Sequence, residues 1–351
     1  MIVYGSSNGP QTNRQTGVTT YTDPNEVTAK PPCDVNNNCK VQLLASSTGT
    51  AAAFGFSVVG MPSLEGGSSE DELLISDPQF NSNDGEVYFY KGASTGIPST
   101  KTQTLVPIPN THTNYTGPHQ FGYNMASVGD LNNDGINDVA ITAPAKNGSD
   151  PGFLYIFYGG PIGGNSAQLG IYGVANYSAT EDWKRDNGNG GLEDILLNWQ
   201  HRDASDPHPQ IIRPSGILNS DYFGYGVSAA GDFNNDGYND VLVNVAAGDF
   251  NISGNLTETG FAIMYFGGPN GLQSDSTINI APDCYGSGSS AICKPYQIYL
   301  PDRENYEHLY VSPFASGDFN GDGLPDIILG GRGRSHPSGQ AYSTGVLYVI
   351  Y

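Results

Sequence analysis

Three nine-residue segments, DLNNDGIND at 130–138, DFNNDGYND at 232–240 and DFNGDGLPD at 318–326, decide the fold of this chain. Each has an oxygen-bearing side chain at positions 1, 3, 5 and 9 of the segment and Gly at position 6. Ca²⁺ is a hard cation that takes several oxygen ligands, and a Gly at the sharp turn lets one short loop surround it. The pattern predicts three calcium-binding loops.

The predicted ligands are the side chains at positions 1, 3, 5 and 9 and the main-chain carbonyl at position 7. They are Asp130, Asn132, Asp134, Ile136 and Asp138; Asp232, Asn234, Asp236, Tyr238 and Asp240; and Asp318, Asn320, Asp322, Leu324 and Asp326. A turn without metal is the alternative for any single copy, because Asp, Asn and Gly are also common in plain turns. Three copies with the same ligand positions favour metal binding.

An EF-hand loop begins with the same spacing, but it closes with a bidentate Glu at position 12 and lies between two helices. Position 12 is here Ile141, Val243 or Leu329. The residues after each loop form short apolar runs rich in β-branched side chains, which are typical of buried strands. We therefore expect each loop to join two β-strands, with the carboxylate at position 9 closing the site.

The surroundings of the loops also recur. Phe-Gly-Tyr precedes the first two loops, at 121–123 and 223–225, and an aromatic strand follows each loop. A further unit at 54–92 keeps this frame without a metal loop. A degenerate unit at 186–194 has Gly188 and Gly190 at two ligand positions, so we expect little or no calcium there.

Repeats of this length, each with about four short strands, are typical of a β-propeller. Each blade would run from the Phe-Gly strand through the calcium loop to an apolar strand, an aromatic strand and an outer strand. Candidates for the outer strand begin at Lys40, Thr104, Gln210 and Tyr296. Stacked calcium-binding β-rolls are the alternative, but the sequence lacks their short Gly-Gly-x-Gly-x-Asp repeats.

The Phe-Gly start, the Asp-x-Asn-x-Asp-Gly-x-x-Asp loop and the Ala143-Pro144 turn resemble FG-GAP repeats. Such repeats occur in the integrin α-subunit propeller, in the propeller of glycosylphosphatidylinositol-specific phospholipase D and in many secreted bacterial proteins. The resemblance covers residues 54–351. It implies an all-β fold, a seven-bladed propeller with Ca²⁺ in the hairpin loop between the first two strands of a blade.

We expect one propeller domain over residues 1–351, with five four-stranded blades and a partial one. The expected bounds are 1–50 for the partial blade, about 51–110, 118–173, 174–218, 219–302 and 308–351 for the blades, and 160–221 for an insert. Either blades are missing or the ring closes with fewer than seven. We favour a fragment, because the sequence begins within a blade.

Composition excludes a nucleic-acid partner, because the net charge is −21 and Lys and Arg together number 14. No apolar run is long enough to span a membrane, and the start of the chain lacks the features of a signal peptide. Cys33 with Cys39 and Cys284 with Cys293 are expected to form local disulfides, the alternative being four free thiols. Disulfides and calcium both indicate an extracellular or cell-surface location.

A cluster within the expected insert is the candidate ligand-binding surface. It consists of Trp183, Lys184, Arg185, Trp199, His201 and Arg202. Cationic side chains beside aromatic rings suit an anionic group or a sugar. The plainer interpretation is that the tryptophans pack a degenerate blade.

The favoured function is a calcium-stabilised adhesion module that recognises an extracellular protein or glycan without catalysis. No nucleophile elbow, zinc helix or phosphate-binding loop is found in the sequence. Two alternatives stay open: a carbohydrate-active enzyme (a polysaccharide lyase or hydrolase) that uses His201 and Arg202, and a scaffold domain of a larger surface assembly. The likeness to integrins supports the scaffold and not the ligand.

Overall fold

The computed structural model describes residues 2–3, 41–42, 44, 53–63, 70–94, 96–107, 118–144, 152–162, 165–171, 184–186, 192–194, 209–212, 222–246, 260–269, 271–273, 284–285, 292–293, 296–298, 315–331 and 346–351. Within this part β-strands are the dominant regular structure, and all named strand pairs are antiparallel. The one helical element, α1 (Phe80–Asn83), is a single turn in which Asn81 and Ser82 have positive φ. The expected all-β class is confirmed.

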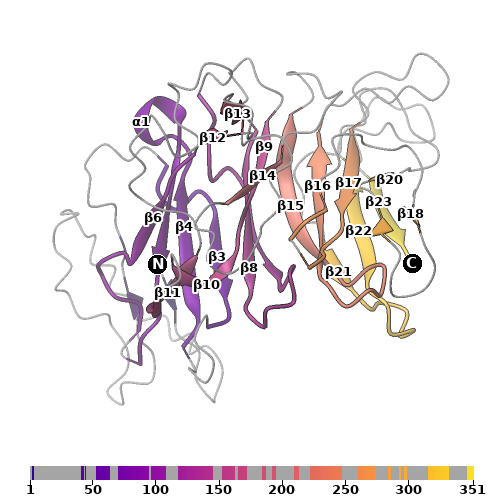
Figure 1. Cartoon of the computed structure of the whole chain (residues 1–351), viewed down its shortest axis with the longest axis horizontal. Helices are drawn as coiled ribbons and strands as arrows, with labels where there is room; N and C mark the ends of the chain where they lie inside the picture. Colours follow the sequence, from indigo (N-terminus) through magenta and orange to yellow (C-terminus); the bar gives the residue numbers. More distant parts are fainter. Residues whose placement is uncertain are drawn as a thin grey trace, which may run out of the picture.

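Four larger sheets follow one another along the chain and stand side by side in Figure 1. The first sheet contains β3 (Val58–Met61), β4 (Glu72–Asp77), β5 (Glu86–Tyr90) and β6 (Gln103–Leu105). The second contains β7 (Met125–Gly129), β8 (Asp138–Ala143), β9 (Phe153–Phe157) and β14 (Gln210–Ile212). The third contains β15 (Phe223–Gly231), β16 (Asp240–Val245), β17 (Phe261–Tyr265) and β20 (Tyr296–Ile298), and the fourth contains β21 (Ala315–Gly317), β22 (Asp326–Gly331) and β23 (Val346–Ile350).

Smaller hairpins complete the described strands. β1 (Ile2–Val3) pairs with β2 (Val41–Gln42), as expected for the last two strands of a partial blade. Three further pairs lie in the long connections: β10 (Gly159–Ile162) with β11 (Asn165–Ile171), β12 (Lys184–Asp186) with β13 (Leu192–Asp194), and β18 (Cys284–Tyr285) with β19 (Ile292–Cys293).

The predicted strand order within a sheet is confirmed. In the second sheet the order is β7–β8–β9–β14. The strand after the Phe-Gly motif is therefore next to the apolar strand, which is followed across the sheet by the aromatic strand and then the outer strand. The first and third sheets repeat this order. Three of the predicted outer strands, near Thr104, Gln210 and Tyr296, occupy that place.

The position of β14 corrects one expectation. We placed residues 174–218 in a blade of their own, but β14 pairs with β9 and completes the second sheet. The hairpin of β12 and β13 therefore lies in the connection between the third and fourth strands of that sheet. A hydrogen bond of Gln210, a buried residue of β14, agrees with the position of β14 in the second sheet. Its Nε2 donates to Leu272 O at 2.7 Å and so joins the second sheet to the third.

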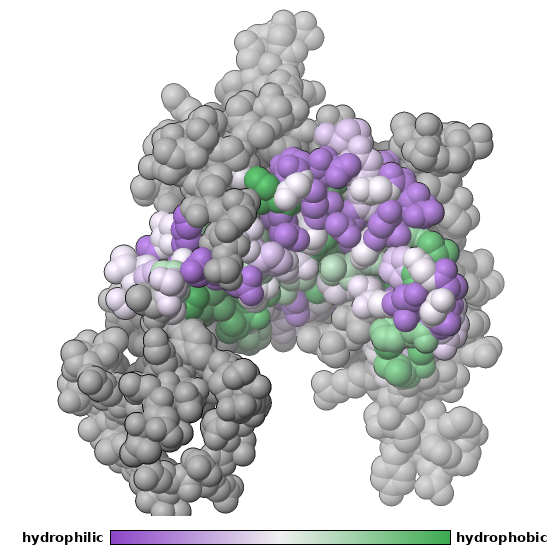
Figure 2. All heavy atoms as spheres, turned by 90° about the horizontal axis from the view of Figure 1, so that it is seen from below, coloured by the Kyte–Doolittle hydropathy of each residue, from purple (hydrophilic) through white to green (hydrophobic). Residues whose placement is uncertain are grey.

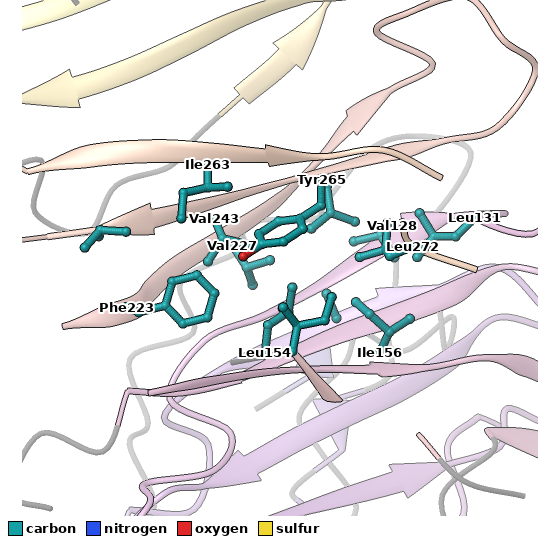
Figure 3. Packing of buried hydrophobic residues seen from close by; sticks show 14 of the residues in the cluster. Val128, Leu131, Leu154, Ile156, Phe223, Val227, Val243, Ile263, Tyr265 and Leu272 are labelled. Atoms are coloured by element: carbon teal, nitrogen blue, oxygen red, sulfur yellow. The ribbon is translucent and has the colours of Figure 1, made fainter. Parts of the chain in front are cut away.

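The hydrophobic core lies between the sheets, because each middle sheet is apolar on both faces. In β9, Phe153, Tyr155 and Phe157 pack in the cluster shared with the first sheet. Leu154 and Ile156, on the opposite face, pack in the cluster shared with the third sheet (Figure 3). A third cluster joins the third sheet to the fourth. Since side chains alternate along a strand, a near-continuous apolar run is what a strand covered on both faces requires.

The Phe-Gly motifs at 121–122 and 223–224 attach the second and third sheets to the sheet before them. Phe121 is fully buried in the first inter-sheet cluster. Gly122 has a φ of +85°, and a Cβ on it would lie 2.8 Å from the side chains of Ser76 and Val87 in the preceding sheet. Only a residue without a side chain fits this close approach without strain.

We predict that Gly122→Ala destabilises the protein by about 2–4 kcal/mol, because it combines left-handed backbone strain with overpacking. Gly60→Ala is the matched control, since a Cβ on Gly60 meets nothing within 4 Å. Urea unfolding of the two variants, followed by circular dichroism, measures the difference. Equal losses for both variants would show that the Phe-Gly contact does not hold the sheets together.

Candidate metal centres

The three acidic loops join the first two strands of their sheets, as predicted. They connect β7 to β8, β15 to β16 and β21 to β22, and these turns lie at the lower end of the sheets in Figure 1. Figure 2 shows this end of the molecule from below, where hydrophilic residues gather over the described part. We call them the first loop (130–138), the second loop (232–240) and the third loop (318–326).

In each loop the carboxylate at position 1 faces inward. In the first loop Asp130 Oδ1 accepts the N–H of Asp134 at 3.1 Å, and Oδ2 accepts the N–H of Gly135 at 2.7 Å. The corresponding distances from Asp232 are 2.9 and 2.9 Å, and from Asp318 they are 3.0 and 2.9 Å. Three separate sequences therefore adopt one loop geometry.

Positions 3 and 5 complete the inner side of the loop. Asn132 Oδ1 accepts the N–H of Asp134 at 3.2 Å, and Asp134 Oδ1 accepts the N–H of Ile136 at 2.9 Å. The same two bonds occur in the second and third loops. Oxygen atoms from positions 1, 3 and 5 thus converge on the inside of each turn.

The carboxylate at position 9 is held differently. Asp138 and Asp240 are fully buried, and each accepts one N–H from position 2 of its own loop and one from a glycine two residues after the aromatic strand, Gly159 or Gly267. Asp326 accepts the N–H groups of Phe319 and Asn320. Among the described residues, no three His, Cys, Asp or Glu side chains are grouped so that they could hold a metal ion. The position-9 carboxylate would therefore have to turn toward the other ligands to join them.

The carboxyl groups of one loop repel one another. Burial, and then the nearby Asp236 and Asp232, raise the pKa of Asp240 to about 7, against the lowering effect of its two backbone hydrogen bonds. Burial also raises the pKa of Asp138 well above its usual range, with Asp134 and Asp130 adding to the shift. A cation would offset this repulsion, and an all-oxygen donor set suits a hard ion such as Ca²⁺. The donor atoms of each loop are therefore of the chemical kind that the predicted metal requires.

Two features of the backbone explain the loop composition. Gly135, Gly237 and Gly323, at position 6, all have positive φ, as predicted for the sharp turn. Position 4, where Asn133, Asn235 and Gly321 also have positive φ, was not among the positions predicted to shape the turn. Asn and Gly are the residues that adopt this left-handed conformation most readily, so the recurrence of Asn, Asn and Gly at position 4 was an available signal.

The candidate ligand-binding cluster is only partly described. Trp183, Trp199, His201 and Arg202 lie outside the described residues. The backbone of Lys184 and Arg185 forms β12, where the register places Lys184 opposite Asp194 and Arg185 opposite Glu193.

The predicted disulfides are likewise described only in part. Cys33 and Cys39 lie outside the described residues. Cys284 and Cys293 are register partners in the hairpin of β18 and β19. Directly paired residues of antiparallel strands have the Cα separation that a disulfide needs.

Comparison with known protein families finds repeats at the same places as the three loop-bearing units. The FG-GAP repeat model matches residues 121–157, 223–262 and 314–350, which are the three segments that carry the loops. This chain contains an integrin-like FG-GAP repeat domain. The predicted resemblance is confirmed.

Similar proteins include several integrin alpha subunits. Integrin alpha-E of Mus musculus is 29% identical over 49% of this chain, and integrin alpha-8 of Mus musculus is 31% identical over 36% of it. Integrin alpha-10 of Homo sapiens is 36% identical over 25% of the chain. The matched segments cover 12%, 12% and 7% of these relatives.

We predict that Asp134→Ala, Asp236→Ala and Asp322→Ala each lower the melting temperature in Ca²⁺ and leave it nearly unchanged in chelator. At about a hundred times the dissociation constant, each independent site would contribute about 2.7 kcal/mol, which the variant loses. Differential scanning calorimetry in both conditions measures this. Asp71→Ala, an exposed position outside the loops, is the control. Losses of equal size with and without Ca²⁺ would count against metal at that loop.

The shift at Asp240 predicts a pH dependence. Because its folded pKa of about 7 lies above the usual value of 3.8, the folded metal-free protein holds a proton that the unfolded chain releases. Stability in chelator therefore falls as pH rises from about 4 through 7. Bound Ca²⁺ displaces this proton, so the increase in melting temperature caused by Ca²⁺ should be larger at pH 8 than at pH 5. An increase that is the same at both values would contradict the assignment of Asp240.

Proposed function

We propose that this chain is part of a calcium-stabilised β-propeller that binds an extracellular ligand without performing chemistry on it. The observation that supports this proposal is the shared geometry of the three loops, in which the position-1 carboxylate accepts the N–H of the position-6 glycine each time. Three such loops at the same end of consecutive sheets suit a structural role, since each ion would fix the turn between two strands.

The propeller itself is supported by the packing. The second and third sheets each pack against a neighbouring sheet on both faces. The first strands of neighbouring sheets are also in contact, since β15 contacts both β7 and β21. Radial repetition of four-stranded sheets is the architecture of a propeller. Seven blades remain the number that the family implies.

The metals would be bound by the predicted ligands of the three loops. Asp134 and its equivalents Asp236 and Asp322 provide a carboxylate that lies on the inner side of the turn. A filled loop would hold the ends of the first two strands of its sheet at a fixed separation, which leaves the opposite end of the sheets as a rigid platform for the connecting loops.

A ligand-binding role is supported by the relatives, which are integrin alpha subunits. An extracellular or cell-surface location is supported by the same likeness and by the register of Cys284 with Cys293, which suits a disulfide. No helix in the described residues is both long and apolar enough to cross a membrane. The ligand would be a protein or a glycan, and the hairpin of β12 and β13 is the proposed contact.

The test is retention of the purified chain on a panel of immobilised polysaccharides and extracellular-matrix proteins, in Ca²⁺ and in chelator. We expect retention in Ca²⁺ that is lost in chelator, with no soluble product released. The variant with Asp134, Asp236 and Asp322 all changed to Ala should lose retention, and Asp71→Ala should keep it. Release of product that persists after repurification and disappears in His201→Ala would replace binding with catalysis.

A further inference from the structure

The first and second loops are hydrogen-bonded to each other, although about a hundred residues separate them in sequence. Asn239, at position 8 of the second loop, donates both its backbone N–H and its side-chain Nδ2 to the carbonyl of Asp130, each at 3.2 Å. A Cβ on the neighbouring Gly129 would lie 2.6 Å from this Nδ2. The amide of Asn239 is thus closely packed against the start of the first loop.

A second connection runs parallel to the first. Gly267 N–H donates to Asp240 Oδ1 at 3.0 Å, and the next residue, Gly268, donates its N–H to Leu131 O at 3.0 Å. Leu131 in turn donates its N–H to Asp138 Oδ2 at 2.8 Å. The position-9 carboxylates of the two loops are therefore joined through main-chain groups.

These contacts involve the residues that a metal would order. Asp130 is the position-1 ligand of the first loop, and its two carboxylate oxygens already accept the N–H groups of Asp134 and Gly135. Asn239 lies between Tyr238 and Asp240, the position-7 and position-9 ligands of the second loop. An ion in the first loop would fix Asp130, and an ion in the second loop would fix the residues on either side of Asn239, so each ion would order one partner of the hydrogen bonds between Asn239 and Asp130.

The third loop lacks the equivalent donors. Its position 8 is Pro325, which has neither a backbone N–H nor a polar side chain. Its ring packs close to Gly231, where a Cβ would lie 3.2 Å away, in the place where Asn239 packs close to Gly129. The second and third loops therefore touch at this point without the hydrogen bonds that Asn239 makes to the first loop.

We propose that Asn239 is a positioning residue that couples the first two metal sites, so that Ca²⁺ bound in one loop raises the affinity of the other. The third site binds independently. This inference rests on the proposed function, because it requires Ca²⁺ in the loops. The ion that binds first orders groups shared with the neighbouring loop, and the second ion then has less ordering to impose.

The experiment compares pairs of sites in the full chain. Asp322→Ala leaves the first and second sites, and Asp134→Ala leaves the second and third. Isothermal titration of the chelator-treated proteins with Ca²⁺ gives the stoichiometry and the cooperativity of each pair. A coupling of about fivefold corresponds to a Hill coefficient of about 1.4. We expect this value or more for Asp322→Ala and a value near 1 for Asp134→Ala.

Asn239→Pro, added to Asp322→Ala, gives the second loop the residue that the third loop has at the same position. We expect two ions to bind with a Hill coefficient close to 1. Asn137→Ala in the same background is the matched control, since Asn137 holds position 8 of the first loop, and it should keep the cooperativity. If Asn239→Pro does not fold, as judged by circular dichroism, Asn239→Ala removes the side-chain donor alone and should lower the coefficient partway.

The outcomes separate this inference from the proposed function. No Ca²⁺ binding to any variant overturns the metal sites and the coupling together. Two ions that bind to Asp322→Ala without cooperativity overturn the coupling and leave the sites in place. Cooperativity that survives both Asn239→Pro and Asn239→Ala overturns the role of this residue. Cooperativity between the second and third sites in Asp134→Ala, equal to that between the first and second sites in Asp322→Ala, also overturns it.

Discussion

Each middle sheet of this chain is apolar on both faces, and neither face is stable in water unless a neighbouring sheet covers it. A buried aliphatic or aromatic side chain contributes about 1.5–3 kcal/mol, and the second and third sheets place such side chains on alternate faces along every central strand. The order of the sheets, the burial of Phe121 and the close approach of Gly122 to the preceding sheet all follow from this requirement. The hydrophobic core is a series of inter-sheet layers rather than one centre.

The acidic loops bring an opposing electrostatic cost to the ends of these layers. Three carboxylates per turn would repel one another if all were ionised, and burial raises the pKa of the position-9 side chains of the first two loops, Asp138 and Asp240. The backbone N–H groups of the turn compensate part of this cost, because they point at the position-1 and position-9 carboxylates. A divalent ion would compensate the rest. The same short sequence thus specifies both the turn and the charge that a metal would neutralise.

The local elements could be predicted from sequence, because each depends on residues close together in the chain. The Asp-x-Asn-x-Asp-Gly spacing located the turns, and β-branched and aromatic runs located the strands on either side of them. The assignment of β14 could not be made this way, since its partner β9 lies across a connection of more than fifty residues that begins with a hairpin of its own. The contact between Asn239 and Asp130 was also beyond sequence reasoning, because it depends on how two sheets stand beside each other.

The fourth sheet differs from its neighbours in one respect. Leu347 and Val349, on the face of β23 that points away from the third sheet, are 64% and 38% exposed, and Tyr351, which follows β23, is 74% exposed. Their counterparts Leu154, Ile156 and Tyr158 in and directly after β9 are fully buried. A sheet that is covered on one face opens locally more often than a sheet covered on both faces. The backbone amides of β22 and β23 should therefore exchange with solvent faster than those of β8 and β16. The third loop belongs to this least protected sheet. An ion there would do more than fix a turn, because it would also stabilise a sheet that has one exposed face.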